Sequence, residues 1–223
     1  MFVQPVCIAS PVCGDTFRPA TSSALPDCRL EPLYRRTLDH VTQALGRDRT
    51  VVVTQYQSIL DEMEREGISA VRNDFAAEGI SASIRIGTQE ALKREDTEAV
   101  IFFAADMPYL PADEIRRYAR QFLWSEKTFG CMVSGPQHVM TNPGAFRLYE
   151  SPALNIDERT GQHGSGQHEP GHGKINAAAG QLLALSGDHG AMRIMKQFPQ
   201  EIYRYQVAEE SVRDIDVRTG PQF

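Results

Sequence analysis

The feature that most constrains the fold is an uninterrupted apolar run that ends at a carboxylate. Residues 100–105 read Val-Ile-Phe-Phe-Ala-Ala, Asp106 follows directly, and Pro108 comes two residues later. An apolar run of this length without alternation predicts a strand buried on both faces, as in a parallel sheet covered by helices. Ligands bind such sheets at the carboxyl ends of the strands. Asp106 is therefore a candidate site residue, although a turn or helix-capping role explains this segment equally well.

Strands and helices alternate through the first half of the chain. Apolar and β-branched segments predict strands over residues 3–10, 50–54, 68–71 and 99–105. Helical spacing of apolar residues predicts intervening helices that end at Gly46 and Gly67, a third that begins near Ile80, and a fourth after Pro111. This alternation implies parallel strands joined by right-handed crossovers, and hence an α/β, three-layer Rossmann-like fold with a mostly parallel sheet.

The pattern changes after residue 128. Short strands are expected over residues 128–134 and 138–142, a helix over 188–198, and further strands over 202–207 and 212–216. Residues 155–176 are rich in glycine and contain His163, His168 and His172, without a cysteine to complete a typical zinc site. We therefore interpret residues 155–176 as a flexible, solvated insertion in one domain that spans residues 1–223.

Composition narrows the class of protein. The net charge of −6 argues against a binder of duplex nucleic acid, but a bound Mg²⁺ could still bring a nucleotide to an acidic chain. The sequence has 41% hydrophobic residues, no signal-peptide pattern and no apolar stretch long enough to span a membrane. Its four cysteines form no Cys-x-x-Cys pair. We expect a cytoplasmic protein without nucleic-acid or membrane partners.

Three aspartates stand where an ordered element meets a loop: Asp106, Asp188 and Asp216. Mg²⁺ favours carboxylate, phosphate and water oxygens, so a pair of these residues could hold a metal–triphosphate complex. Taken without further context, a cap or turn role explains each of them better than a metal role, and Asp188 is well placed to be the N-cap of the helix that follows. The chain has no Walker A loop, no dinucleotide-binding glycine fingerprint and no Gly-x-Ser-x-Gly elbow.

Several short segments, taken together and in order, resemble the molybdenum-cofactor nucleotidyltransferases, especially the molybdopterin cytidylyltransferases and their guanylyltransferase relatives. The matching segments are 31–38, Asn73 with 78–84, 105–108, 142–146, 185–191 and 214–216. The resemblance implies the three-layer fold of the nucleotide-diphospho-sugar transferases. It also implies that the phosphate of a molybdopterin-type cofactor attacks the α-phosphorus of CTP or GTP, with CTP favoured, and that pyrophosphate leaves. Such transfer depends mostly on positioning and on charge neutralisation by Mg²⁺.

The resemblance also implies roles for individual residues. Asp106 and Asp216 match metal ligands, and Arg18 and Asp106 match catalytic positions. The nucleotide-binding positions correspond to Ala9, Gly14, Arg18, Ser81 and Ser83. Asn142 and Asp188 fall on the side of the molybdopterin cofactor.

The first loop departs from the family pattern. Where the family has a glycine-rich loop followed by a lysine, this chain has Pro11, which lacks an N–H to donate, and no lysine before Lys93. Arg29, Arg35 and Arg36 are the nearby cations that could substitute, although arginine is not a simple replacement for lysine. The departure leaves a second interpretation open: a catalytically impaired relative that binds cofactor or nucleotide as an accessory factor for maturation of a molybdenum hydroxylase. A third, a small-molecule-binding scaffold unrelated to molybdenum, rests on the fold alone.

Overall fold

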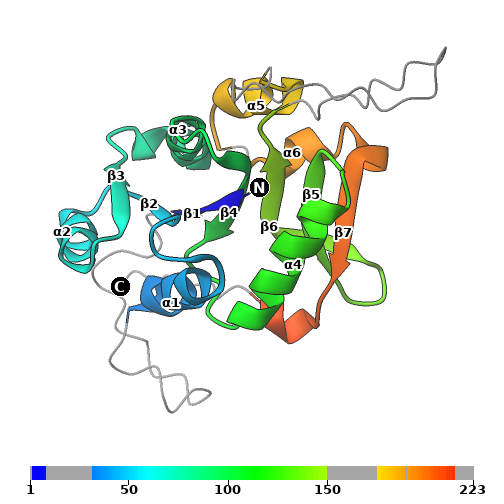
Figure 1. Cartoon of the computed structure of the whole chain (residues 1–223), viewed down its shortest axis with the longest axis horizontal. Coiled ribbons are helices and arrows are strands. Elements are labelled where there is room, and N and C mark those ends of the chain that lie inside the picture. The colour runs from blue at the N-terminus through cyan, green and yellow to red at the C-terminus, as the bar shows by residue number, and fades with distance from the viewer. Residues whose placement is uncertain (1, 9–31, 150–174, 189, 214–223) are drawn as a thin grey trace, which may run out of the picture.

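A computed structural model describes residues 2–8, 32–149, 175–188 and 190–213 (Figure 1). Its strands are β1 (Phe2–Ile8), β2 (Val51–Thr54), β3 (Ser69–Arg72), β4 (Thr97–Ala104), β5 (Phe129–Ser134), β6 (Val139–Arg147) and β7 (Ile202–Gln206). Its α-helices are α1 (Leu33–Leu45), α2 (Gln57–Glu66), α3 (Ile80–Leu92), α4 (Ala112–Trp124), α5 (Ala177–Leu183) and α6 (Met192–Met195). Three short 3₁₀ helices, η2 (Ala76–Glu78), η3 (Pro199–Glu201) and η4 (Glu209–Val212), complete the described elements.

The strands form one seven-stranded sheet in the order β3-β2-β1-β4-β6-β5-β7. The pairs β1–β2, β1–β4, β2–β3 and β5–β7 are parallel, whereas β6 runs antiparallel to both β4 and β5. The prediction of an α/β fold with a mostly parallel sheet is therefore confirmed. The carboxyl ends of β1 to β4 meet at one edge of the sheet, and β6 begins at that same edge.

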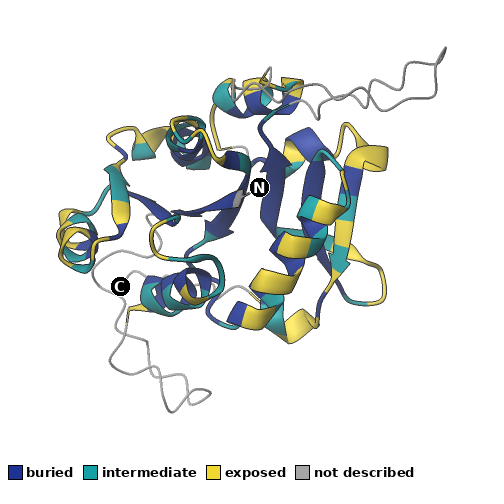
Figure 2. Cartoon of the chain, in the orientation of Figure 1, coloured by how far each residue is buried: buried dark blue, intermediate teal, exposed yellow. Residues whose placement is uncertain are grey.

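Two apolar clusters, one on each face of the sheet, hold the three layers together. Helices α1, α2 and α4 contribute to the first cluster, and α3, α5 and α6 to the second. Strand β4 supplies both: Ile101 and Phe103 belong to the first cluster, and Val100 and Phe102 to the second. Figure 2 shows the buried sheet between helices whose outer surfaces are exposed. The buried-strand prediction for this segment is thus confirmed.

Strand β6 is longer than predicted. The expected strand ended at Asn142, but β6 continues to Arg147. Proline is usually excluded from a strand interior, yet Pro143 lies within β6. Here the register with β5 shifts: Cys131 pairs with Gly144, and Met132 pairs with Thr141. Asn142 and Pro143 therefore occupy a bulge, where a proline is tolerated, and the bond between them is cis.

The helix predicted over residues 188–198 is much shorter in the structure. The described helix α6 spans only Met192–Met195, and its N-cap residue is Ala191, so Asp188 does not cap it. Gly187 has a φ of 69°, which turns the chain just before Asp188. Helix α5 was not predicted at all, although its N-cap, Asn176, accepts a hydrogen bond from the Ala179 N–H at 2.8 Å.

The predicted insertion falls mostly outside the described residues, which resume at Ile175. Tyr149 and Ile175, the described residues on either side of that gap, form an isolated antiparallel bridge. In the part of the chain that the structure describes, no helix is both long and apolar enough to cross a bilayer.

The end of β6 carries a buried arginine that ties three elements together. Arg147 is 5% exposed and forms an ion pair with Glu98 of β4. Its Nη2 donates to the Leu123 carbonyl of α4 at 2.6 Å and its Nε to the Lys127 carbonyl at 3.0 Å. Its guanidinium also lies 5.5 Å from the Phe122 ring centroid. The β4–β6 and α4 layers are therefore fastened at one point.

We predict that Arg147→Met lowers the free energy of unfolding by about 3–5 kcal/mol, because it leaves Glu98 without its ion-pair partner and two backbone carbonyls without their hydrogen-bond donor. Urea denaturation followed by circular dichroism measures the change. Arg120→Met is the matched control: Arg120 also lies over an aromatic ring, that of Trp124 at 5.2 Å, but it is exposed. Its effect should stay within about 0.5 kcal/mol. Equal losses in the two variants would contradict the prediction.

Candidate functional site

Asp106 lies at the carboxyl edge of the sheet, two residues beyond the end of β4. The Ala105 N–H donates to the Ile8 carbonyl of β1 at 3.1 Å, and the Ala105 carbonyl accepts a hydrogen bond from the Thr37 hydroxyl of α1 at 3.1 Å. Ala105 is buried, whereas Asp106 is half-buried. The backbone that presents this carboxylate is thus held by a strand and by a helix.

Asn142 is brought to the same edge. Gly144 of β6 pairs with Phe102 of β4, and the two strands are antiparallel. Asn142 precedes Gly144 by two residues, so it lies toward the carboxyl end of β4, the end that carries Asp106. Asn142 is half-buried. Its position is compatible with a contact to a ligand at this edge.

A second part of the edge is the start of α3. Asn73, which follows β3 and is 2% exposed, donates from Nδ2 to the Ser83 hydroxyl at 2.8 Å. Its Oδ1 accepts from the Phe75 N–H at 2.9 Å, and its own N–H donates to the Thr54 carbonyl at 2.8 Å. Asn73 therefore locks the ends of β2 and β3 to the first turn of α3. It was not among the predicted site residues, although it lies in one of the segments that carry the resemblance.

Ser81 and Ser83 differ in what their hydroxyl groups do. The Ser83 hydroxyl is engaged by Asn73. Ser81 is fully buried, and within the described ranges its Oγ has no hydrogen-bond partner. A buried hydroxyl without a partner is unfavourable, so a polar ligand atom would satisfy it. The N–H groups of the first helical turn lie around Ser81 and attract anionic or polar groups.

The segment around Asp188 packs against the same helix start. A Cβ on Gly79, the N-cap residue of α3, would lie 2.9 Å from the Asp188 Cα and 3.0 Å from the Gly187 carbonyl oxygen. Arg85 of α3 donates to the Leu185 carbonyl at 2.7 Å and so holds the other end of the segment. The structure thus brings Asp188 next to the turn that carries Ser81 and Ser83, and leaves it exposed.

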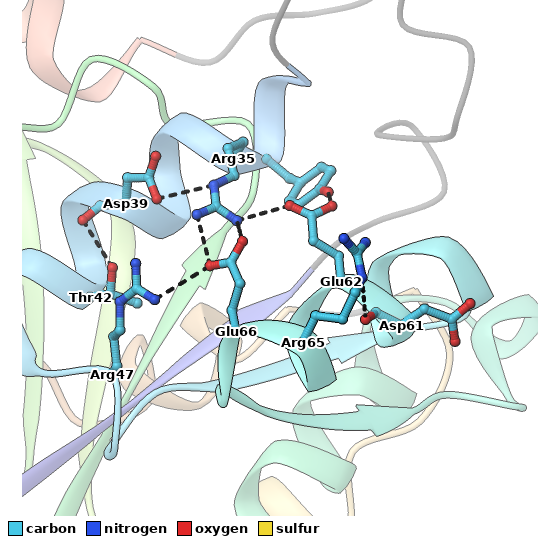
Figure 3. A network of polar contacts seen from close by, with 9 residues as sticks. Arg35, Asp39, Thr42, Arg47, Asp61, Glu62, Arg65 and Glu66 are labelled. Carbon is cyan, nitrogen blue, oxygen red and sulfur yellow. Dashed lines mark hydrogen bonds and ion pairs between the residues drawn. The ribbon is translucent and has the colours of Figure 1, made fainter.

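One predicted substitute for the missing lysine is already engaged. The Arg35 guanidinium contacts Asp39 at 3.1 Å, Glu62 at 2.8 Å and Glu66 at 2.8 Å (Figure 3). Hydrogen bonding to Glu66 is the main cause that raises the pKa of Arg35 above its ordinary value, so the group stays charged. Because carboxylates of α1 and α2 surround it, Arg35 is not available to a triphosphate.

The remaining predicted residues, Ala9, Gly14, Arg18 and Asp216, lie outside the described residues, as does Arg29. The last described residue, Arg213, contacts Tyr109, which follows Asp106 by three residues: the Arg213 guanidinium lies 4.9 Å from the Tyr109 ring centroid. Among the described side chains, no three His, Cys, Asp or Glu residues gather into a metal-binding group. A metal at Asp106 would therefore need oxygens from a substrate, from water or from residues such as Asp216.

Comparison with solved structures defines the class of fold. Rv0371c from Mycobacterium tuberculosis H37Rv is 16% identical, with a TM-score of 0.63 over 97% of this chain and 93% of that one. A nucleotidyl transferase from Methanothermobacter, also 16% identical, has a TM-score of 0.61 over 96% of this chain and 91% of its own. A CMP:2-keto-3-deoxy-manno-octonic acid synthetase complexed with CTP is 13% identical, with a TM-score of 0.53 over 93% and 90%. The fold is that of the nucleotidyltransferases.

The chain belongs to the family of MobA-like NTP transferase domains, which matches residues 23–202. No curated protein matches it by sequence. The coarser part of the resemblance, an NTP transferase domain, is thereby confirmed. A second structure of Rv0371c, from Mycobacterium tuberculosis, is a complex with manganese. Its chain is 14% identical to this one, with a TM-score of 0.60 over 93% of this chain and 89% of that one.

The position of Gly79 yields a test of the α3 start. Its φ of 94° and ψ of −173° lie in a region that is nearly exclusive to glycine, and a Cβ would press on the backbone of residues 187 and 188. We predict that Gly79→Ala lowers the free energy of unfolding by about 1–3 kcal/mol. Gly180→Ala is the control, because Gly180 lies inside α5 with open space around its Cβ position. That change should stabilise by about 0.5–1 kcal/mol. Chemical denaturation that ranks the two variants in the opposite order would disprove this packing.

The Arg35 network yields a test by pH. Hydrogen bonding to Arg35 lowers the pKa of the Glu66 carboxyl from its ordinary value of 4.5. Because the folded pKa is the lower one, the interaction stabilises the fold above pH 4.5 and is lost as the pH falls through the lowered value. Glu66→Gln should therefore melt below the wild type at neutral pH, and the gap should close in acid. Glu64→Gln, an exposed change on the same helix, should show no such trend in melting temperature. Parallel pH profiles for both variants would rule out the assigned role of Glu66.

Proposed function

We propose that this protein is a nucleotidyltransferase that moves a nucleotide from an NTP, with CTP favoured over GTP, to the phosphate of a molybdopterin-type cofactor. The observation that carries the proposal is the presentation of Asp106. Its backbone is fixed by β1 and α1, at the edge of the sheet where α3 begins with the buried Ser81. Family membership supports an NTP as the donor substrate. The choice of acceptor rests on the resemblance of short segments of the sequence to the molybdenum-cofactor nucleotidyltransferases.

The residues fit a hard divalent cation such as Mg²⁺. Mg²⁺ is commonly held by one or two carboxylates together with substrate phosphates and water, and Asp106 offers one such carboxylate. Asp216 is the second residue proposed to hold the metal. When bound, the metal would neutralise charge on the phosphates during transfer.

The chain's own residues have separate tasks in this scheme. An oxygen of the acceptor phosphate forms a bond to the α-phosphorus of the NTP, while the bond from that phosphorus to the β-phosphate oxygen breaks and pyrophosphate leaves. Ser81 and the first turn of α3 bind the nucleotide, and Ser83 is held by Asn73 to keep that turn in place. Asn142 and Asp188 orient the acceptor from the two sides of the edge. Arg18 is the cation proposed to act on the triphosphate.

A second candidate function is favoured by one specific observation. Arg35, the first arginine in sequence among the described residues, is enclosed by Asp39, Glu62 and Glu66. The triphosphate would therefore lack that compensating charge. A protein that binds nucleotide or cofactor without turnover, as an accessory factor for a molybdenum hydroxylase, agrees with this loss of an available cation.

Pyrophosphate release separates the two functions. Purified protein is incubated with Mg²⁺, molybdopterin cofactor and each of CTP, GTP and ATP. We predict release with CTP, and a loss of at least about 100-fold in Asp106→Asn, because the metal-side charge is removed. Asp113→Asn is the matched control: this exposed aspartate pairs with Arg116 at 2.5 Å on the surface of α4 and should leave activity unchanged. If the protein binds the cofactor but releases no pyrophosphate with any nucleotide, the enzyme proposal is rejected in favour of the accessory-factor proposal.

A further inference from the structure

The Thr37 side chain is an isolated polar group in an apolar layer. It is 2% exposed and belongs to the face of α1 that covers β1, β2 and β4. It lines a small cavity together with apolar neighbours that include Cys7, Leu38 and Val52. A valine has the same shape and would suit this layer better, since it buries no hydroxyl. The hydroxyl therefore needs an explanation beyond packing.

The hydroxyl holds the peptide that precedes Asp106. Thr37 Oγ1 donates to the Ala105 carbonyl at 3.1 Å, and this carbonyl belongs to the peptide group that also contains the Asp106 nitrogen. Ala105 lies past the last residue of β4, while its N–H still reaches the Ile8 carbonyl at 3.1 Å. The residue before Asp106 is thus held from the strand on one side and from α1 on the other.

Helix α1 is in turn held from its outer side. Two residues before Thr37, Arg35 joins α1 to Glu62 and Glu66 of α2 (Figure 3). The Tyr34 hydroxyl also donates to Glu62. Because α1 cannot easily slide along the sheet with these contacts in place, the Thr37 hydroxyl stays at a fixed position relative to Ala105. The carboxylates around Arg35 therefore have a structural role, which is to hold α1 against α2.

We propose that Thr37 is a positioning residue for Asp106: its hydroxyl orients the Ala105–Asp106 peptide, and with it the carboxylate, for metal binding and nucleotidyl transfer. This inference rests on the proposed function of Asp106. Residues that orient metal ligands commonly affect metal affinity or activity by about 10–100-fold when they are replaced. Thr37 touches no reacting atom in this scheme and acts only through Asp106.

The test compares Thr37→Val with Thr37→Ser. Valine removes the hydroxyl and keeps the shape, so we expect Mn²⁺ affinity, measured by electron paramagnetic resonance without substrates, to fall by about 10-fold. The kcat for pyrophosphate release should fall by about the same factor, with the KM for CTP little changed. Serine keeps the hydroxyl and should restore both. Should Thr37→Val fail to fold, Thr37→Ala compared with Thr37→Ser isolates the hydroxyl in the same measurements.

Thr42→Val is the matched control. Thr42 lies on the same helix and also donates to a backbone carbonyl, that of Asp39 at 3.1 Å, but it has no contact with the Ala105–Asp106 peptide. It should leave Mn²⁺ affinity and kcat unchanged. Wild-type values in Thr37→Val, or equal losses in Thr37→Val and Thr42→Val, overturn the inference while Asp106→Asn still abolishes Mn²⁺ binding. If Asp106→Asn instead binds Mn²⁺ as tightly as the wild type, the metal role of Asp106 is overturned, and the inference about Thr37 is overturned with it.

Discussion

The parallel pairing of β1 with β4 carries the site. Seven residue pairs join these strands, ending with Ile8 opposite Ala104, and the two strands lie at the centre of the sheet between its apolar clusters. Burial on both faces leaves β4 no alternative register, because a shift would move large apolar side chains out of a close-packed layer. The strand can therefore deliver Asp106 to a defined place at the edge. Gly87 of α3 packs so closely on β1 and β4 that a Cβ there would lie 2.5 Å from a Val6 methyl, which fixes α3 on the same pair of strands.

Two kinds of connection give the edge two different sides. On the side of β1, β2 and β3, helical crossovers return the chain in parallel, so helix starts and strand ends meet, and Asn73 joins them by hydrogen bonds. On the side of β6, an antiparallel strand brings in its own beginning, with the bulge at Asn142. Helix N-termini suit anionic groups. A bulged strand instead re-aims a side chain. This asymmetry is the physical reason to place the nucleotide at the start of α3 in the proposed reaction, with the acceptor between Asn142 of β6 and Asp188.

The sequence predicted the features whose causes are local or strongly periodic. The apolar run before Asp106 and the glycines that end α1 and α2 are of this kind, and the structure confirms them. The failures have a different origin. The strand expected to end at Asn142 continues to Arg147, because a bulge accommodates Pro143. Asp188 had the chemistry of a helix cap, but helix α6 begins only at Met192, with Ala191 as its N-cap. The engagement of Arg35 by α2, and the contact of Gly79 with Asp188, join residues far apart in sequence, so no local pattern could predict them.

The charge balance around α1 bears most directly on whether this family member is a catalyst. The proposed reaction requires a chain with a net charge of −6 to bind a triphosphate at an edge that already carries Asp106. The fold commits Arg35 to holding α1 in place, and α1 in turn holds the peptide before Asp106 through Thr37. The same arginine therefore cannot serve both architecture and phosphate binding. In the proposed reaction, charge neutralisation would fall to the start of α3, to a bound divalent cation and to Arg18, which together would have to replace the lysine that the resemblance leads one to expect.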